Sequence, residues 1–146
     1  MKKSVHRHDV IRDIVRREAI HTQRDLVAKL QELGYECTQA TVSRDIANIG
    51  LLKSQDGLYV LPEDMRLYHM LSEIVGEIHV AGHSVVVRTN PGIAPGVADA
   101  IDNVHIEGLL GTVAGDNTIL IIAYSPEDAK FVKQRLLELK RHFKRV

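Results

Sequence analysis

Apolar residues in the first third of the chain recur at the three- and four-residue spacing of amphipathic helices. The first group predicts a helix over His8–Glu18 with the inward positions Val10, Ile11, Ile14 and Val15. Thr22 and the acid three residues later have the spacing of a capping box, which predicts a second helix that ends at Gly34. Thr38 is a suitable cap for a third helix, which Gly50 terminates. Three short helices with tight connections are the plan of a helix-turn-helix domain.

A hairpin is predicted directly after the third helix. Asp56-Gly57 separates the apolar segments Leu51–Ser54 and Leu58–Leu61, and an Asp-Gly pair in this position is a strong hairpin signal. Because a hairpin behind a helix-turn-helix forms a wing, we expect residues 1–61 to be a winged helix-turn-helix DNA-binding domain. The polar stretch that follows predicts a linker over residues 62–70.

The remaining chain, residues 71–146, is predicted to contain strand, strand, helix, strand, strand and helix in that order. The segments that carry this order are Leu71–Val80, Ser84–Thr89, Ala94–Val104, Ile106–Val113, Ile119–Tyr124 and a last helix that starts at Ser125. This pattern predicts an α+β oligomerisation domain, a mainly antiparallel sheet with two helices on one face, in an α/β chain of two domains. The other face of the sheet is then free for another subunit, and a two-layer monomer is the alternative.

A polar turn, Gly111–Thr118, joins the two apolar runs of this second domain. Two glycines, a carboxylate and an amide do not fit the middle of a buried strand, because unpaired polar groups there are costly. The backbone of the turn and Asp116 are therefore available to bind a ligand. The alternative is ordinary turn chemistry, since Asp and Asn side chains bond their own backbone.

The composition excludes several classes of protein. With 45% hydrophobic and 26% charged residues, the chain is that of an ordinary soluble globular protein. No apolar run is long enough to span a bilayer, and Lys2 and Lys3 are followed by polar residues rather than by the core of a signal peptide. Cys37 is the only cysteine, which excludes an internal disulfide and fits a cytoplasmic protein. The histidines are scattered, and His79 and His83 lie in a predicted strand and turn, so we expect no metal.

The charge is balanced, with 19 basic and 19 acidic residues. Residues 1–61 hold ten Lys and Arg against eight Asp and Glu, which is not a strong nucleic-acid signature. If DNA is bound, the placement of charges on the surface, or the joint action of several copies of the domain, must matter more than the total charge.

The third predicted helix carries polar side chains on one face. Thr41, Arg44 and Asn48 share this face, and Gln39 and Ser43 lie near the start of the helix. Arginine can form two hydrogen bonds to guanine, Gln and Asn can do the same with adenine, and Ser and Thr can bond either kind of base edge. These five residues are the predicted DNA contacts. The alternative is a solvated face on which Arg44 pairs with a nearby acid, and the adjoining helices and wing favour DNA.

Signatures of catalysis are scarce. The chain contains no phosphate-binding loop pattern, no His-Glu-x-x-His zinc motif and no Gly-x-Ser-x-Gly nucleophile elbow. We therefore expect that the chain is not an enzyme. The alternative is an enzyme or small-molecule-binding domain that uses the turn at Gly115 as a pocket, with the N-terminal domain as a protein-interaction module. No pair of nucleophile and base supports it.

Two stretches occur in order in the two predicted domains: Ala40-Thr41-Val42-Ser43-Arg44-Asp45-Ile46 and Gly111–Ile122. Together with Thr89-Asn90-Pro91-Gly92 before a helix, they resemble the bacterial arginine repressor family, over essentially the whole chain. The resemblance implies a repressor of genes for arginine biosynthesis and catabolism that binds double-stranded operator DNA, with Ser43 and Arg44 as the DNA-reading pair. It also implies a homo-oligomer in which trimers stack into a hexamer, with L-arginine bound between the trimers as corepressor.

The chain departs from the family pattern where the effector binds. The family turn usually has the sequence Gly-Asp-Asp-Thr, and here Asn117 stands in place of the second acid. Pro95 occupies a position where the family usually has Gln, whereas Asp102 and Asp116 match the family's acids. These four residues are the expected effector-binding residues. A variant of this interpretation is a paralogue with a weakened or altered response to arginine that acts with a partner subunit.

Overall fold

The computed structural model describes residues 2–144 of the chain, with the side chains of residues 6–141. The helices and strands form two compact units, and the division between them falls between Met65 and Arg66. Each unit has its own buried apolar core. The chain therefore has the two-domain organisation that the sequence predicts.

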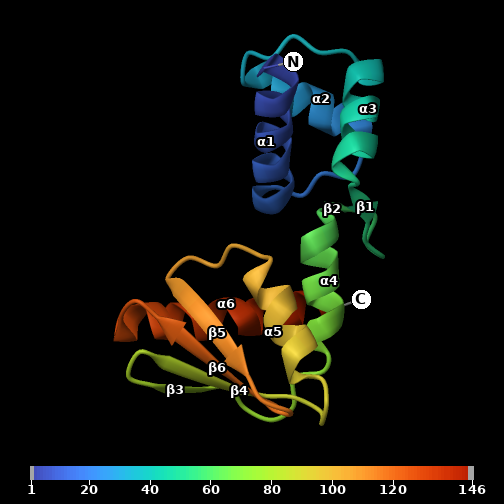
Figure 1. Cartoon of the computed structure of the whole chain (residues 1–146). Coiled ribbons are helices and arrows are strands. Elements are labelled where there is room, and N and C mark those ends of the chain that lie inside the picture. The colour runs from blue at the N-terminus through green and yellow to red at the C-terminus, as the bar shows by residue number, and fades with distance from the viewer. Residues whose placement is uncertain (1, 145–146) are drawn as a thin grey trace. The chain divides into compact units, whose positions relative to one another are not determined.

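The N-terminal unit is built on three helices, α1 (Lys2–Arg17), α2 (Gln23–Glu32) and α3 (Gln39–Ile49) (Figure 1). Their apolar faces meet in one core, whose largest fully buried members are Ile11, Leu26, Leu30, Val42 and Leu61. The Thr22 hydroxyl accepts a hydrogen bond of 3.0 Å from the backbone N–H of Asp25, so α2 begins where the capping signal predicts. Helix α1 begins at Lys2, before the predicted start at His8. The prediction missed this first part of the helix because the mostly polar residues ahead of His8 show no apolar periodicity.

The wing expected behind α3 is present. Strands β1 (Leu52–Lys53) and β2 (Tyr59–Val60) pair in antiparallel fashion. Gly57 in the connecting turn has a φ of 79°, a left-handed conformation that favours glycine. The Lys53 ammonium donates hydrogen bonds to the carbonyl oxygens of His21 and Gly57 and lies 4.0 Å from the centre of the Tyr59 ring. These contacts hold the wing to the loop that precedes α2.

Residues 62–70, which we expected to be a linker, form helix α4 (Pro62–Leu71). A proline stands at the first helical position and two acids lie in the first turn, where both are favoured. The Glu63 carboxylate accepts a hydrogen bond of 2.6 Å from Arg12. The polar residues therefore begin a helix and pair with α1, instead of forming a solvated spacer.

The C-terminal unit is an antiparallel sheet with the strand order β3-β4-β6-β5. The strands are β3 (His79–Ala81), β4 (Ser84–Arg88), β5 (Leu109–Ala114) and β6 (Thr118–Ala123). The prediction for Leu71–Val80 is largely wrong, because Leu71 ends α4 and only the last two residues of this segment belong to β3. The segment lacks the period-two alternation that marks a half-buried strand.

Helices α5 (Ala94–Asp102) and α6 (Pro126–Lys144) cover one face of this sheet (Figure 1). One core contains the strand residues Val85, Val87, Ile119 and Ile121 and the helix residues Val97, Ile101, Val132 and Leu136. On the opposite face, Leu120 pairs with Val86 of β4 and with Val113 of β5. The side chain of Val113 is 67% exposed and that of Leu120 is 39% exposed. The helices of this unit thus leave an apolar sheet face uncovered, as the pattern of apolar strands predicts.

Within the described part of the chain, no helix combines the length and the apolar character needed to cross a membrane. Nor do the described residues include a group of three or more His, Cys, Asp or Glu side chains arranged to hold a metal ion.

Candidate DNA interface and effector site

Helix α3 begins and ends at the residues that its capping signals predict. The Thr38 hydroxyl accepts a hydrogen bond from the backbone N–H of Thr41 at 3.2 Å and bonds the Thr41 hydroxyl at 3.0 Å. Gly50 follows the helix with a left-handed φ of 81°, and its N–H donates to the carbonyl oxygen of Ile46. A helix fixed at both ends presents its side chains in a defined orientation.

All five predicted DNA contacts lie on the accessible side of α3 or at its start. Gln39, Arg44 and Asn48 are exposed, whereas Thr41 and Ser43 are half-buried. The core of the unit receives the opposite side of the helix, through Val42, Asp45 and Ile49. The helical arrangement expected from the sequence is therefore observed, although DNA contact itself stays a prediction.

Arg44 has no ion-pair or hydrogen-bond partner among the side chains that the structure describes. The alternative, in which Arg44 pairs with a nearby acid, is therefore not supported, because none of the described acids pairs with Arg44. An exposed guanidinium without a partner keeps all five of its N–H donors available to a base or a phosphate.

Asp45 is a structural residue that the sequence analysis missed. Its carboxylate is almost fully buried on the inner side of α3, where it bonds Arg7 Nη2 at 3.0 Å and His8 Nε2 at 2.9 Å, both from α1. Burial disfavours the charged carboxylate, but the hydrogen bonds from Arg7 and His8 outweigh this effect and lower the pKa of Asp45. The sequence does contain a signal for this role. Asp45 follows Val42 by three residues and precedes Ile49 by four, so helical spacing places its carboxylate on the buried, apolar side of the helix.

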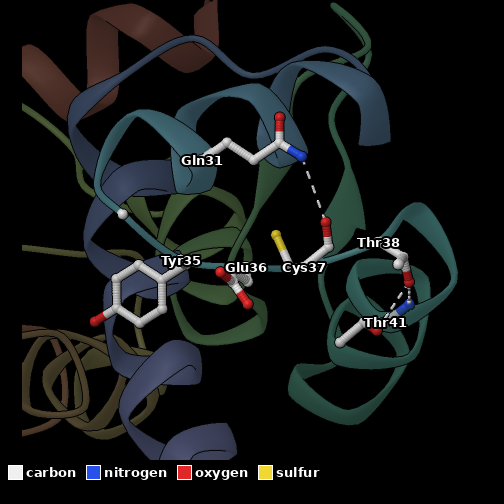
Figure 2. Close-up of a pocket in the computed structure, with 7 residues that line it drawn as sticks. Gln31, Tyr35, Glu36, Cys37, Thr38 and Thr41 are labelled. Carbon is white, nitrogen blue, oxygen red and sulfur yellow. Dashed lines mark hydrogen bonds between the residues drawn. The ribbon is translucent and has the colours of Figure 1, made fainter.

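A surface hollow lies where α2 ends and α3 begins (Figure 2). Gln31 of α2 donates a hydrogen bond of 3.5 Å to the carbonyl oxygen of Cys37, and Thr38 and Thr41 line the same hollow. Burial raises the pKa of the Cys37 thiol, which favours its neutral form. The bond between Gln31 and Cys37 helps to set the turn that positions α3 against α2, and the sequence did not predict this bond.

In the C-terminal unit, the turn between β5 and β6 is tied by its backbone to neighbouring segments. The carbonyl oxygen of Asp116 accepts hydrogen bonds from the N–H groups of Gly92 and Ala94, at 3.1 and 3.2 Å, at the start of α5. The carbonyl oxygen of Asn117 accepts one from Thr89 at 2.8 Å. The turn is thus fixed by its backbone, and the side chains of Asp116 and Asn117 are exposed.

The four expected effector residues do not converge in one chain. Pro95 lies in the first turn of α5, beside the Asp116 turn, whereas Asp102 is the last residue of that helix. Seven residues of helix separate these two by about 10 Å along the axis. The Thr112 hydroxyl of β5 donates its hydrogen to the Asp102 carboxylate, whose two oxygens lie 2.9 and 3.0 Å from the hydroxyl oxygen. The sequence did not predict that Thr112 positions Asp102, because the packing of α5 on the sheet beside β5 brings the two together.

Comparison with known proteins decides the identity of this arrangement. Residues 1–67 match the family model described as "Arginine repressor, DNA binding domain", and residues 71–138 match "Arginine repressor, C-terminal domain". The chain belongs to the arginine repressor family. It is thus a DNA-binding, arginine-responsive transcriptional repressor, as the resemblance of its motifs predicts.

Relatives in the arginine repressor family are similar over nearly their full length. The arginine repressors of Bacillus velezensis and Bacillus subtilis are each 43% identical over 143 residues, which cover 91% of this chain and 96% of theirs. The arginine repressor of Thermus thermophilus is 39% identical over 150 residues, 95% of this chain and 92% of its own. The predicted fold class is confirmed by the two family matches, which meet near the division between the two units.

Proposed function

We propose that α3 enters the major groove of operator DNA, where Arg44 and Ser43 bond base edges and Gln39, Thr41 and Asn48 lie beside them. The observation that carries this proposal is the exposed Arg44 side chain, which has no partner among the described residues of a helix that is capped at both ends. The major groove, about 12 Å wide, admits an α-helix. Occupation of an operator by this repressor then regulates genes of arginine metabolism.

L-arginine is the proposed corepressor, held by Asp116 and Asp102. The Asp116 carboxylate is exposed and makes no hydrogen bond with a described residue, so it is available to a cation. L-arginine carries both a guanidinium and an ammonium group, and each forms a charge-assisted hydrogen bond with a carboxylate. Asp102 ends α5, whereas the turn that carries Asp116 lies beside the start of that helix. One ligand therefore reaches an Asp102 and an Asp116 together only where two subunits meet.

The uncovered apolar face of the sheet is the proposed contact between subunits, in a trimer that stacks with a second trimer. A ligand that bridges two trimers favours the hexamer by mass action. Several DNA-binding domains in one assembly then bind paired half-sites together, which offsets the weak net charge of each domain. A second, paralogous subunit enters this proposal only if this chain alone fails to bind L-arginine.

The proposal is tested with duplexes that the protein selects from a random-sequence pool in the presence of L-arginine. Arg44→Ala should weaken binding to the selected duplex by at least about tenfold, because it removes a two-hydrogen-bond contact to a base. Fluorescence anisotropy measures this affinity, and light scattering confirms that the oligomer is unchanged. Arg17→Ala is the control, because it removes an exposed arginine that already pairs with Asp13. Normal binding by the Arg44 variant would contradict the assignment of α3.

A further inference from the structure

Most of the Lys and Arg side chains that the structure describes in the N-terminal unit have a partner within the chain. In residues 1–65, the described Lys and Arg side chains with intramolecular partners are Arg7, Arg12, Arg16, Arg17, Lys29 and Lys53. The first five pair with acids, and Lys53 donates to two carbonyl oxygens and covers the Tyr59 ring. Among the described side chains of this unit, the cations left without a partner are Arg24 and Arg44.

Arg24 lies on the same side of α2 as Gln31, whose side chain reaches the turn that precedes α3. It precedes Gln31 by seven residues, two helical turns, so the two side chains share one face of α2 about 10 Å apart. Gln31 bonds the backbone just before α3 and borders the hollow that Thr41 lines from the other side (Figure 2). Lys29, on another side of α2, bonds Glu18 instead. One surface therefore runs from Arg24 past Gln31 and Thr41 to Arg44.

We infer that Arg24 is a phosphate-contacting residue of this repressor, placed to bind the DNA backbone beside the groove that α3 occupies. This inference rests on the proposed function, since it takes α3 as the helix in the groove. In helix-turn-helix proteins the helix before the recognition helix crosses the DNA backbone. An exposed guanidinium on that helix, with no internal acid to compete, is suited to a phosphate oxygen.

The two unpaired arginines then have separate roles. Phosphate contacts set the position of a protein on the duplex and contribute affinity to every sequence, whereas base contacts distinguish one sequence from another. Arg24 therefore supports binding to any duplex, and Arg44 supports the preference for the operator. The mild net charge of the unit is consistent with this division, because the positions of the unpaired arginines among the described residues matter more than the total charge.

The test measures the affinity of the full chain for two probes, a random-sequence duplex and a duplex selected by the protein, from about 50 to about 200 mM salt. Arg24→Ala should weaken binding to both probes by the same factor, about tenfold for each DNA-binding domain engaged, as for loss of one charge-assisted hydrogen bond. It should also reduce the slope of log affinity against log salt by about 0.9 for each DNA-binding domain engaged. Arg24→Lys should restore the slope, because a phosphate accepts a point charge.

Arg17→Ala is the matched control, since it removes the same charge from an exposed residue that is paired with Asp13. Circular dichroism verifies that each variant is folded. The inference is overturned if Arg24→Ala keeps the salt slope of the control, or if it changes the ratio of the two affinities instead of both affinities equally. If the unmodified chain shows no salt-dependent binding to either probe, the proposed function itself fails, and this outcome is distinct from the other two.

Discussion

At the scale of single residues, Asp45 shows how a charge on α3 can serve the fold. Its ionised carboxylate is held by Arg7 and His8 of α1, and the pKa of Asp45 is lowered despite burial. A group whose pKa is lower in the folded state than in the unfolded state stabilises the fold above its unfolded pKa, about 3.9 for Asp. This stabilisation is lost as the pH falls below that value, through the folded pKa. The pair therefore fixes α3 against α1 throughout the neutral range.

Asp45→Asn should lower the free energy of unfolding of the N-terminal unit by about 2 kcal/mol at neutral pH, because Arg7 loses its charged partner in a buried site. The difference from the unmodified protein should shrink as the pH falls below about 4, because the unfolded chain takes up a proton at Asp45 before the folded protein does. Urea denaturation followed by circular dichroism over a pH series measures both effects. Asp13→Asn, which breaks the exposed pair with Arg17, should change stability by less than about 0.5 kcal/mol. Equal stability of the Asp45 variant and the unmodified protein at neutral pH would be inconsistent with this role.

Asn117 is the residue at which this chain differs most clearly from the effector-binding pattern expected for its family. Asn117→Asp should strengthen L-arginine binding by about tenfold, because it adds a carboxylate to an exposed turn that already carries Asp116. Calorimetric titration with L-arginine measures the change, with citrulline and ornithine as comparison ligands. Gln134→Glu, which adds the same charge on α6, should leave the affinity unchanged. An unchanged affinity in the Asn117 variant would point to Pro95 as the cause of a weakened site.

At the scale of elements, local signals predicted most of the N-terminal unit. The caps at Thr22 and Thr38, the stop at Gly50 and the Asp-Gly hairpin each act within a few residues, so the sequence shows them directly. Helix α4 carried an equally local start signal, Pro62 followed by two acids, but its polar beginning resembles a linker. Its apolar residues Leu67 and Leu71 belong to the core of the C-terminal unit, which the sequence does not reveal.

The parts of the site that were not predicted depend on contacts between distant segments. Arg7 and Asp45 are 38 residues apart in the chain. Asp102 and Thr112 meet because α5 packs on the sheet beside β5. Periodicity identifies which side of an element is buried, but it does not identify the partner of a polar group on that side. The five predicted α3 residues needed only helical periodicity, and their placement was accordingly predicted well.

At the scale of the whole molecule, the uncovered sheet face is the proposed contact between copies of this chain. A contiguous exposed apolar surface on a soluble protein marks an interaction site, and here it is formed by alternate residues of paired strands, including Val86, Val113 and Leu120. These side chains project from a regular sheet, so a second copy can pack against them without change in the fold. Joining copies through this face would let several DNA-binding units, each with few unpaired cations among its described residues, bind DNA together.

Val113→Lys should therefore break the oligomer while leaving the single chain folded. The side chain is 67% exposed in the isolated chain, so a lysine there is solvated in the monomer, but it carries an unpaired charge into any interface formed by this face. Light scattering should report a mass that falls toward that of one chain, and circular dichroism should remain unchanged. Phe131→Lys is the matched control, since Phe131 is another exposed apolar residue, 48% exposed, but lies on α6 rather than on the open sheet face. If the Val113 variant keeps the mass of the unmodified oligomer, subunits meet through another surface, and the placement of L-arginine between them has to be revised with it.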